Sequence, residues 1–306
     1  MKKMTEGQKM FGNLLAIFFL YGLFFMLFED IDRNQFEPLH DLIDWQLLLF
    51  FVITLFLVAV VLHRYSKRMD ERISREQAKK EHQMRRELTQ NISHELKTPV
   101  ASIQGYLELM LHNPDIQPAQ QQQFLEKSLA QTHRLTALLH DLSTLNRMDY
   151  ATQCLEREEV DIIEIVHEVD TNTFLARQQQ QQTFITNLPE TLHVRGNREL
   201  LFSVFQNLLD NSIKYAGKNT TICLSATKEK KYWKFVFSDN GVGILPEHRN
   251  RVFERFYRID KGRSRNLGGT GLGLSIVKNA VKLHGGQIKI QDVPNGGVAF
   301  VFTIAE

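Results

Sequence analysis

The sequence predicts three structural parts in order: two membrane-crossing helices, an all-α helical hairpin and an α+β domain. Residues 10–28 and 45–62 contain no charged side chain. Apolar residues recur at helical spacing between residues 84 and 150, with one break at 113–115. Beyond Met148, helical and strand-like patterns alternate. These three observations define the predicted fold class.

The first part is predicted to cross a membrane twice. Residues 10–28 form a run of 19 uncharged residues, which as a helix would span about 28 Å. The second run opens with Trp45, where an interfacial aromatic residue belongs. Lys and Arg gather outside the two runs, whereas the intervening 29–44 holds six acidic residues and one arginine. By the positive-inside rule we expect both termini in the cytoplasm. The expected segments are a cytoplasmic N-terminus (1–9), two transmembrane helices (10–28 and 45–63), a short extracytoplasmic loop (29–44) and a helical linker (64–83).

Composition and cysteine usage exclude several classes of partner and site. The formal net charge is +2, and no Lys/Arg block interleaved with aromatics occurs, so we expect no direct binding of nucleic acid. Cys154 and Cys223 are the two cysteines of the sequence and form no Cys-x-x-Cys pattern. Neither a disulfide framework nor a zinc site is therefore indicated.

The second part, residues 84–150, is predicted to be a hairpin of two long helices. The second helix is expected to begin near Pro118, after the break that follows the first. Each apolar stripe is wide for a lone hairpin. Two hairpins packed as a four-helix bundle would bury both stripes, so we expect a homodimer. The stripe residues are Leu88, Ile92, Leu96, Ile103, Tyr106, Leu107, Met110 and Leu111 on the first helix, and Phe124, Leu125, Leu129, Leu135, Leu138, Leu139, Leu142, Leu145 and Met148 on the second.

The third part, residues 155–306, is predicted to be an α+β sandwich. Helical spacing runs through 162–169 and 200–215. Alternating apolar residues predict strands, which we place at 221–225, 232–237, 287–291 and 298–304.

The hairpin carries a candidate nucleophile. His94 and Thr98 are four residues apart, so a helix places both side chains on one face. An exposed imidazole that is neutral near pH 7 has a lone pair that can accept a phosphoryl group. Glu95, as an immediate neighbour, does not share that face.

The α+β domain carries three motifs suited to nucleotide binding. Asn207, Asn211 and Lys214 fall on one face of a predicted helix. The Asp239-Asn-Gly-Val-Gly243 turn follows a predicted strand, and its carboxylate can accept a hydrogen bond from an exocyclic amine. Gly268-Gly-Thr-Gly-Leu-Gly-Leu274 precedes a helix, where successive amides can cradle phosphates. Between Arg258 and this loop the chain is polar and without periodicity, as in a mobile lid.

These motifs, in this order, resemble the membrane-bound sensor histidine kinases of bacterial two-component systems, of the HisKA type, over roughly residues 84–306. The resemblance implies a dimerisation and phosphotransfer domain at 84–150 and, at 155–306, a catalytic ATP-binding domain similar to the gyrase and Hsp90-type ATPases. Many relatives have Gly-Asp where this chain has Gly196-Asn197. Asn also serves as an N-cap, so we expect little loss of helix stability from this difference.

The resemblance also implies cofactors and residue roles. ATP and Mg²⁺ are the expected cofactors. His94 would be the phosphoacceptor, Glu95 would take its proton, and Thr98 would orient a water for dephosphorylation of the partner. The expected nucleotide-binding residues are Asn207, Asn211 (also the Mg²⁺ ligand), Lys214 and Tyr215, then Asp239, Gly241 and Gly243, Arg258 near the γ-phosphate, and Gly269, Thr270, Gly271, Leu272 and Gly273 of the Gly-rich loop.

We therefore expect autophosphorylation and transfer of the phosphoryl group to an aspartate of a separate response regulator, in a homodimer in the lipid of the bacterial plasma (inner) membrane. Two alternatives remain at this point. A gyrase-like ATPase would use nucleotide to drive conformational change, and a phosphatase-dominant or scaffolding protein would seldom transfer phosphate.

Overall fold

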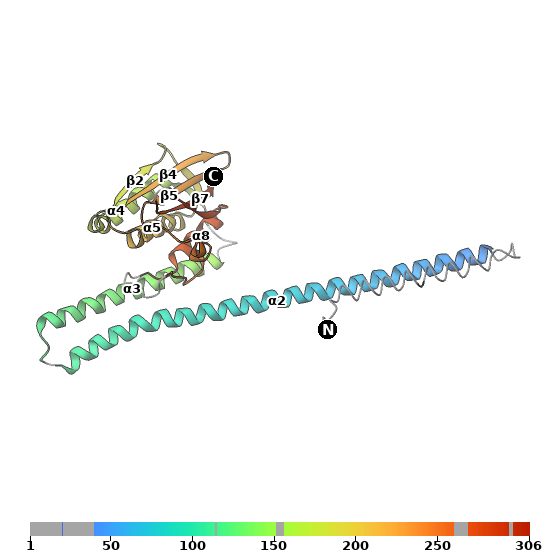
Figure 1. Cartoon of the computed structure of the whole chain (residues 1–306), viewed down its shortest axis with the longest axis horizontal. Coiled ribbons are helices and arrows are strands. Elements are labelled where there is room, and N and C mark those ends of the chain that lie inside the picture. The colour runs from blue at the N-terminus through green and yellow to red at the C-terminus, as the bar shows by residue number, and fades with distance from the viewer. Residues whose placement is uncertain (1–19, 21–39, 114, 151–155, 260–268, 294–295) are drawn as a thin grey trace. The chain divides into compact units, whose positions relative to one another are not determined.

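The computed structural model describes Leu20 and residues 40–113, 115–150, 156–259, 269–293 and 296–306, coloured along the chain in Figure 1. The chain divides into two compact units, residues 1–86 and 87–306. The elements run in chain order as α2 (His40–His112), α3 (Pro118–Tyr150), β1 (Glu158–Asp161), α4 (Ile162–Gln180), β2 (Thr183–Asn187), β3 (His193–Gly196), α5 (Arg198–Tyr215), β4 (Thr221–Glu229), β5 (Tyr232–Asp239), α6 (Pro246–Arg249), η3 (Arg251–Phe253), α8 (Gly273–Leu283), β6 (Ile288–Asp292) and β7 (Val298–Ala305).

Helix α2 continues from the first unit into the second. Its 73 residues include the segment 64–83 that the sequence predicted to be a helical linker. Within the described residues, no helix is both long enough and apolar enough to cross a membrane. The first predicted span, 10–28, lies outside the described residues apart from Leu20. The second predicted span, 45–63, falls within α2.

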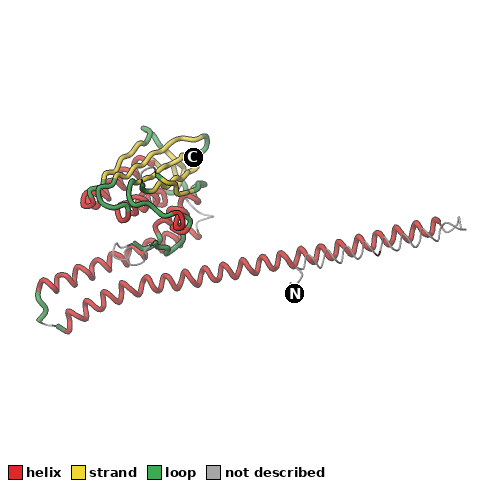
Figure 2. The backbone as a smooth tube through the Cα atoms, viewed as in Figure 1, coloured by secondary structure: helices red, strands yellow, loops and turns green. Residues whose placement is uncertain are grey.

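The predicted hairpin is present as the C-terminal part of α2 and the whole of α3 (Figure 2). α2 ends at His112, where the side-chain Nδ2 of Asn113 donates to the Leu109 carbonyl oxygen at 2.7 Å. α3 begins at Pro118, a residue pre-set for the first turn of a helix. Across the hairpin the rings of Tyr106 and Phe124 stack with centroids 5.5 Å apart. Several stripe residues nevertheless stay exposed: Leu107, Leu111, Leu125, Leu129 and Leu139.

The α+β domain contains a five-stranded sheet in the order β2-β4-β5-β7-β6 and a two-stranded sheet of β1 and β3. All four predicted strands are present, and β4 extends beyond the predicted end, to Glu229. The sequence prediction missed β1, β2 and β3. β1 and β3 have four residues each, too few to display a period, and β2 is an edge strand whose residues are mostly exposed.

Helices α4, α5 and α8 cover one face of the five-stranded sheet (Figure 1). Alternate residues of β5 are buried, namely Trp233, Phe235, Phe237 and Asp239. Phe235 stacks on Phe302 of β7 at 5.0 Å, and Phe205 of α5 meets Phe235 edge-on at 5.6 Å. The same two-residue period that buries the aromatic rings therefore carries the Asp239 carboxylate onto the helix-facing side of the sheet.

Helix α5 is positioned by the turn that precedes it. The Asn197 side chain accepts a hydrogen bond from the Leu200 amide at 3.0 Å, so Asn is the N-cap that the sequence predicted. The backbone N–H of Asn197 donates to Nε2 of His284 at 3.0 Å. A Cβ at Gly196 would lie 2.5 Å from the His284 ring, so this approach requires glycine. The turn thereby connects the start of α5 to the end of α8.

Candidate active site

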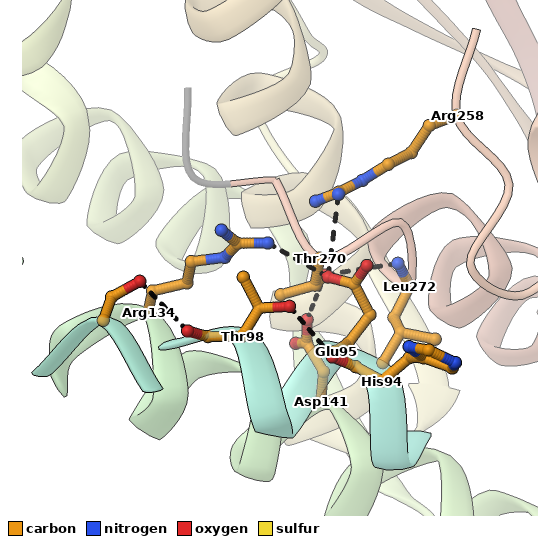
Figure 3. Close-up of polar contacts among 9 residues, drawn as sticks. His94, Glu95, Thr98, Arg134, Asp141, Arg258, Thr270 and Leu272 are labelled. Carbon is orange, nitrogen blue, oxygen red and sulfur yellow. Dashed lines mark hydrogen bonds and ion pairs between the residues drawn. The ribbon is translucent and has the colours of Figure 1, made fainter. Parts of the chain in front are cut away.

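His94 and Thr98 lie one turn apart on α2, and both side chains are exposed. The Thr98 hydroxyl donates to the His94 carbonyl oxygen at 3.1 Å (Figure 3). The imidazole is therefore accessible to a reacting partner. The hydroxyl would have to give up this hydrogen bond to the backbone before it could donate to a water.

Glu95 is held between two guanidinium groups (Figure 3). Its Oε2 atom lies 3.0 Å from Nη2 of Arg134 on α3 and 3.6 Å from Nη1 of Arg258 in the α+β domain. The side chains of Arg134 and Arg258 are only 10% and 6% exposed. The residue next to His94 thus joins the hairpin to the cation that the sequence assigned to the γ-phosphate.

Asp239 sits at the end of β5 with donors on both carboxylate oxygens. The Ser212 hydroxyl donates to Oδ2 at 2.7 Å, and the Gly241 amide donates to Oδ1 at 3.1 Å. A Cβ at Gly241 would lie 2.3 Å from the Ala216 carbonyl oxygen, so the turn packs against the end of α5 only because residue 241 is glycine. Ser212 was not predicted from the sequence, although it directly follows Asn211.

Helix α5 presents the predicted amide face to the start of α8. The Asn207 amide nitrogen donates to the Ser203 carbonyl oxygen at 2.8 Å. Its own carbonyl oxygen lies only 2.5 Å from where a Cβ of Gly273 would stand. Asn211 is half-buried further along the helix. Amide oxygens suit Mg²⁺, so the donor set of this face fits a metal that takes its other ligands from phosphate and water. Lys214 and Tyr215, at the end of the helix, are exposed.

The Gly-rich loop is anchored to Phe256, which lies three residues beyond η3. Gly271 adopts φ +73, and its carbonyl oxygen accepts a hydrogen bond from the Phe256 amide at 2.8 Å. Phe256 itself has φ +63, a costly conformation for a bulky residue. The Leu272 amide donates to the Thr270 hydroxyl at 3.2 Å, just before α8 begins. The predicted lid, 259–267, lies outside the described residues apart from Ile259, and so does Gly268.

Thr270 makes a second contact that the sequence did not predict. Its hydroxyl donates to Oδ2 of Asp141 on α3 at 2.8 Å (Figure 3). Burial raises the pKa of the Asp141 carboxyl, while the Thr270 hydrogen bond and the charges of His140 and Lys214 oppose that rise and Asp210 adds to it. Neither Asp141 nor Arg134 was predicted, because each occupies an ordinary polar position on a helix and acquires a partner only through folding.

Two family models match this chain. Residues 84–151 match the His Kinase A (phospho-acceptor) domain, and residues 196–306 match the histidine kinase-, DNA gyrase B-, and HSP90-like ATPase family. The first match contains His94, Glu95 and Thr98. The second contains every residue that the sequence assigned to nucleotide binding.

Individual relatives agree with the family models. The chain is 36% identical over 222 residues to the sensor-like histidine kinase SenX3 of Mycolicibacterium smegmatis, a match that covers 72% of this chain and 58% of SenX3. It is 34% identical over 229 residues to the sensor histidine kinase WalK of Bacillus subtilis, covering 72% and 37%. The fold also resembles that of the histidine kinase ThkA solved in complex with the response regulator protein TrrA, with a TM-score of 0.58 and 23% identity over 72% of this chain and 61% of that one.

The fold and the comparisons define a class of protein. Residues 84–151 and 196–306 match the phosphoacceptor and ATPase domain families of the histidine kinases, and the named relatives support a sensor histidine kinase. The chain spans less than two thirds of the length of the curated relatives it matches.

Proposed function

We propose that this chain is an ATP-dependent protein-histidine kinase that phosphorylates itself on His94 and passes the phosphoryl group to an aspartate of a separate response regulator. The contact between Arg258 and Glu95 carries the proposal. A cation of the ATPase domain lies 3.6 Å from the carboxylate adjacent to the exposed His94. Phosphoryl transfer depends mainly on positioning and charge stabilisation, and this contact brings the required charges to the acceptor helix.

In the proposed autophosphorylation, a ring nitrogen of His94 forms a bond to the γ-phosphorus of ATP as the bond to the bridging oxygen breaks and ADP leaves. Glu95 takes the imidazole proton, and Arg258 stabilises the charge on the transferring group. Glu95 reaches this role only by exchanging part of its pairing with Arg134 and Arg258.

The nucleotide site assigned from the sequence supports this proposal. Asp239, already fixed by Ser212 and Gly241, would accept a hydrogen bond from the adenine amine. Asn211 would bind Mg²⁺, which neutralises phosphate charge when present, and Asn207 would assist it. Lys214 and the amides of residues 269–273 would meet phosphate oxygens, while Tyr215 would pack near the base.

The phosphoryl group would next pass to the response regulator. The similar histidine kinase ThkA was solved in complex with a response regulator protein, which supports a partner of that kind here. Phosphatase activity toward the regulator would use Thr98, whose hydroxyl lies on the same face as His94. Thr98 cannot accept the imidazole proton, so its proposed role is confined to orienting a water.

The test is radiolabelling of the full-length protein in detergent with ATP that carries ³²P at the γ-phosphate. His94→Gln should abolish incorporation of label, whereas His112→Gln, an exposed histidine of the same helix, should not. The label on the parent protein should be lost in acid and stable in base, as expected for phosphohistidine. An ATPase that only drives conformational change would acquire no label, and undiminished labelling of His94→Gln would refute the assignment of the acceptor.

We also propose that residues 10–28 and 45–63 cross the plasma membrane with both termini in the cytoplasm. Support comes from the two uncharged runs and the excess of Lys and Arg outside them. Many apolar side chains of 49–62 are exposed on α2, as expected for a surface that faces lipid. A cysteine introduced at Gln35, in a Cys154→Ser/Cys223→Ser background, should react with a membrane-impermeant maleimide on intact cells. A cysteine at Lys79 should stay protected until the cells are lysed.

A homodimer completes the proposal. Leu107, Leu111, Leu125, Leu129 and Leu139 remain exposed on the hairpin. A second hairpin would cover them in a four-helix bundle.

A further inference from the structure

The Gly-rich loop is bound to the hairpin by a carboxylate. Asp141 of α3 accepts a hydrogen bond of 2.8 Å from the Thr270 hydroxyl, and Thr270 belongs to the loop that we assign to the phosphates of ATP. Asp141 lies among Leu138, Leu142 and Leu145, which pack into the core that also contains α8. The carboxylate is thus held in a partly buried position where water screens it poorly.

Asp141 also acts on a second phosphate-binding group. The Lys214 ammonium lowers the pKa of the Asp141 carboxyl, against the larger rise caused by burial, so the two side chains interact electrostatically. Lys214 is the cation that we assign to phosphate oxygens at the end of α5. The hairpin carboxylate therefore accepts a hydrogen bond from one group of the proposed phosphate site and feels the charge of another.

We propose that Asp141 is an internal competitor for the phosphates of ATP: its carboxylate holds the Gly-rich loop against α3 through Thr270, and bound nucleotide displaces it. This inference rests on the proposed function, because it takes the loop to be the phosphate site. The competition follows from charge, since a triphosphate and a carboxylate cannot share one hydroxyl proton and repel each other at short range.

The contact between Glu95 and Arg258 likewise joins a carboxylate of the hairpin to a further group that we assign to phosphate. The Arg258 guanidinium lies 3.6 Å from the Glu95 carboxylate. Nucleotide that draws Thr270 and Arg258 toward its phosphates would release Asp141 from Thr270 and Glu95 from Arg258, while Glu95 keeps its pairing with Arg134. Binding of ATP would then loosen the ATPase domain from the hairpin and remove one of the two cations that hold Glu95.

The test compares nucleotide affinity in full-length variants in detergent. Asp141→Asn keeps the shape and an acceptor oxygen but removes the charge, and it should lower the Kd for Mg·ATP roughly five- to tenfold. Asp141→Ala, which removes both, should shift the Kd in the same direction and provides a second variant should the amide fold poorly. Glu126→Gln neutralises an exposed carboxylate elsewhere on α3 and should leave the Kd unchanged.

Two further arms make the test specific for phosphate. Adenosine, measured by displacement of a fluorescent ATP analogue, should bind Asp141→Asn and the parent equally well, because it carries no phosphate. In a Thr270→Val background, Asp141→Asn should have a smaller effect on ATP affinity, as expected for residues that are coupled.

Unchanged ATP affinity in both Asp141 variants would overturn the inference. An equal increase in adenosine affinity would overturn it as well. An undiminished increase in ATP affinity in the Thr270→Val background would also overturn it. If the parent binds neither ATP nor adenosine, the proposed function itself fails, and this inference fails with it. If the parent binds ATP but the Asp141 substitutions do not change its affinity, the proposed function stands and only the competition by Asp141 is refuted.

Discussion

The hairpin and the ATPase domain bury their apolar residues in different ways. In the ATPase domain Phe205, Phe235 and Phe302 are at most 2% exposed and pack on one another. In the hairpin Leu111 is 79% exposed and Leu129 is 57% exposed. The ATPase domain therefore buries its apolar residues among its own elements and against α3, whereas several leucines of the hairpin remain exposed and require a further surface to cover them.

Helix α3 shows this difference between adjacent residues. Leu138 is 3% exposed and belongs to the core shared with α8, whereas Leu139 is 53% exposed. One face of α3 is thus covered by the ATPase domain, and the other is open to a second hairpin. Because the covered face also carries Asp141, any change in how α3 packs can reach the Gly-rich loop directly.

The largest effect is expected from truncation in the core of the ATPase domain. Phe235→Ala should lower the free energy of unfolding of the ATPase domain by about 4 kcal/mol, because a large cavity would remain between α5 and β7. Trp233 fluorescence during denaturant unfolding reports this domain. Phe174→Ala, at a phenylalanine of α4 that is 56% exposed, is the matched control and should change stability by less than about 0.5 kcal/mol.

A charged substitution on the open face of the hairpin should affect assembly instead. Leu129→Asp should weaken the homodimer by about 3 kcal/mol, because one leucine from each protomer loses its burial. Sedimentation velocity in detergent measures the dissociation. Leu175→Asp substitutes a similarly exposed leucine of the ATPase domain and should leave the dimer intact. Equal dissociation in the two variants would show that the hairpin face is not the interface.

A smaller effect tests how the ATPase domain positions its amide-bearing helix. Asn197→Ala removes the N-cap of α5 and should cost about 1 kcal/mol, whereas Asn197→Asp keeps the acceptor and should cost little. Chemical denaturation followed at Trp233 distinguishes the two variants. Equal stability of the alanine variant and the parent would mean that packing alone holds the start of α5.

The smallest effect is a pH dependence confined to the ATPase domain. Burial lowers the pKa of His284, whose Nδ1–H donates to the Ala280 carbonyl oxygen while Nε2 accepts from the Asn197 amide. The folded protein therefore binds the proton less readily than the unfolded chain. The stabilisation is complete above the ordinary histidine pKa of about 6.5 and is lost progressively as the pH falls below it.

Thermal unfolding between about pH 7.5 and 5 measures this dependence. His284→Gln should flatten the decline in Tm on the acid side, and His112→Gln, an exposed histidine of the hairpin, should not. A decline that is identical in the parent and His284→Gln would place the titrating group elsewhere.

The sequence by itself determined the elements whose signals are local. Helical periodicity predicted the hairpin and its break at Asn113, alternation predicted β4 to β7, and the residue type of Asn197 predicted the N-cap that the structure contains. Spacing also placed Thr98 on the face of His94, where its hydroxyl meets the His94 carbonyl oxygen. Each of these depends on neighbours within a few residues, which is the range over which dihedral preferences and side-chain spacing act.

Only the tertiary structure determined which polar and charged side chains contact one another. Nothing local marks Asp141, Arg134 or Ser212, whose partners lie 129, 39 and 27 residues away in the chain. The short strands β1 to β3 likewise depend on pairing rather than on their own pattern. Polar contacts over such separations form because packing brings two groups together and removes water between them. Their energy therefore resides in the assembled fold and leaves no periodic trace in the sequence.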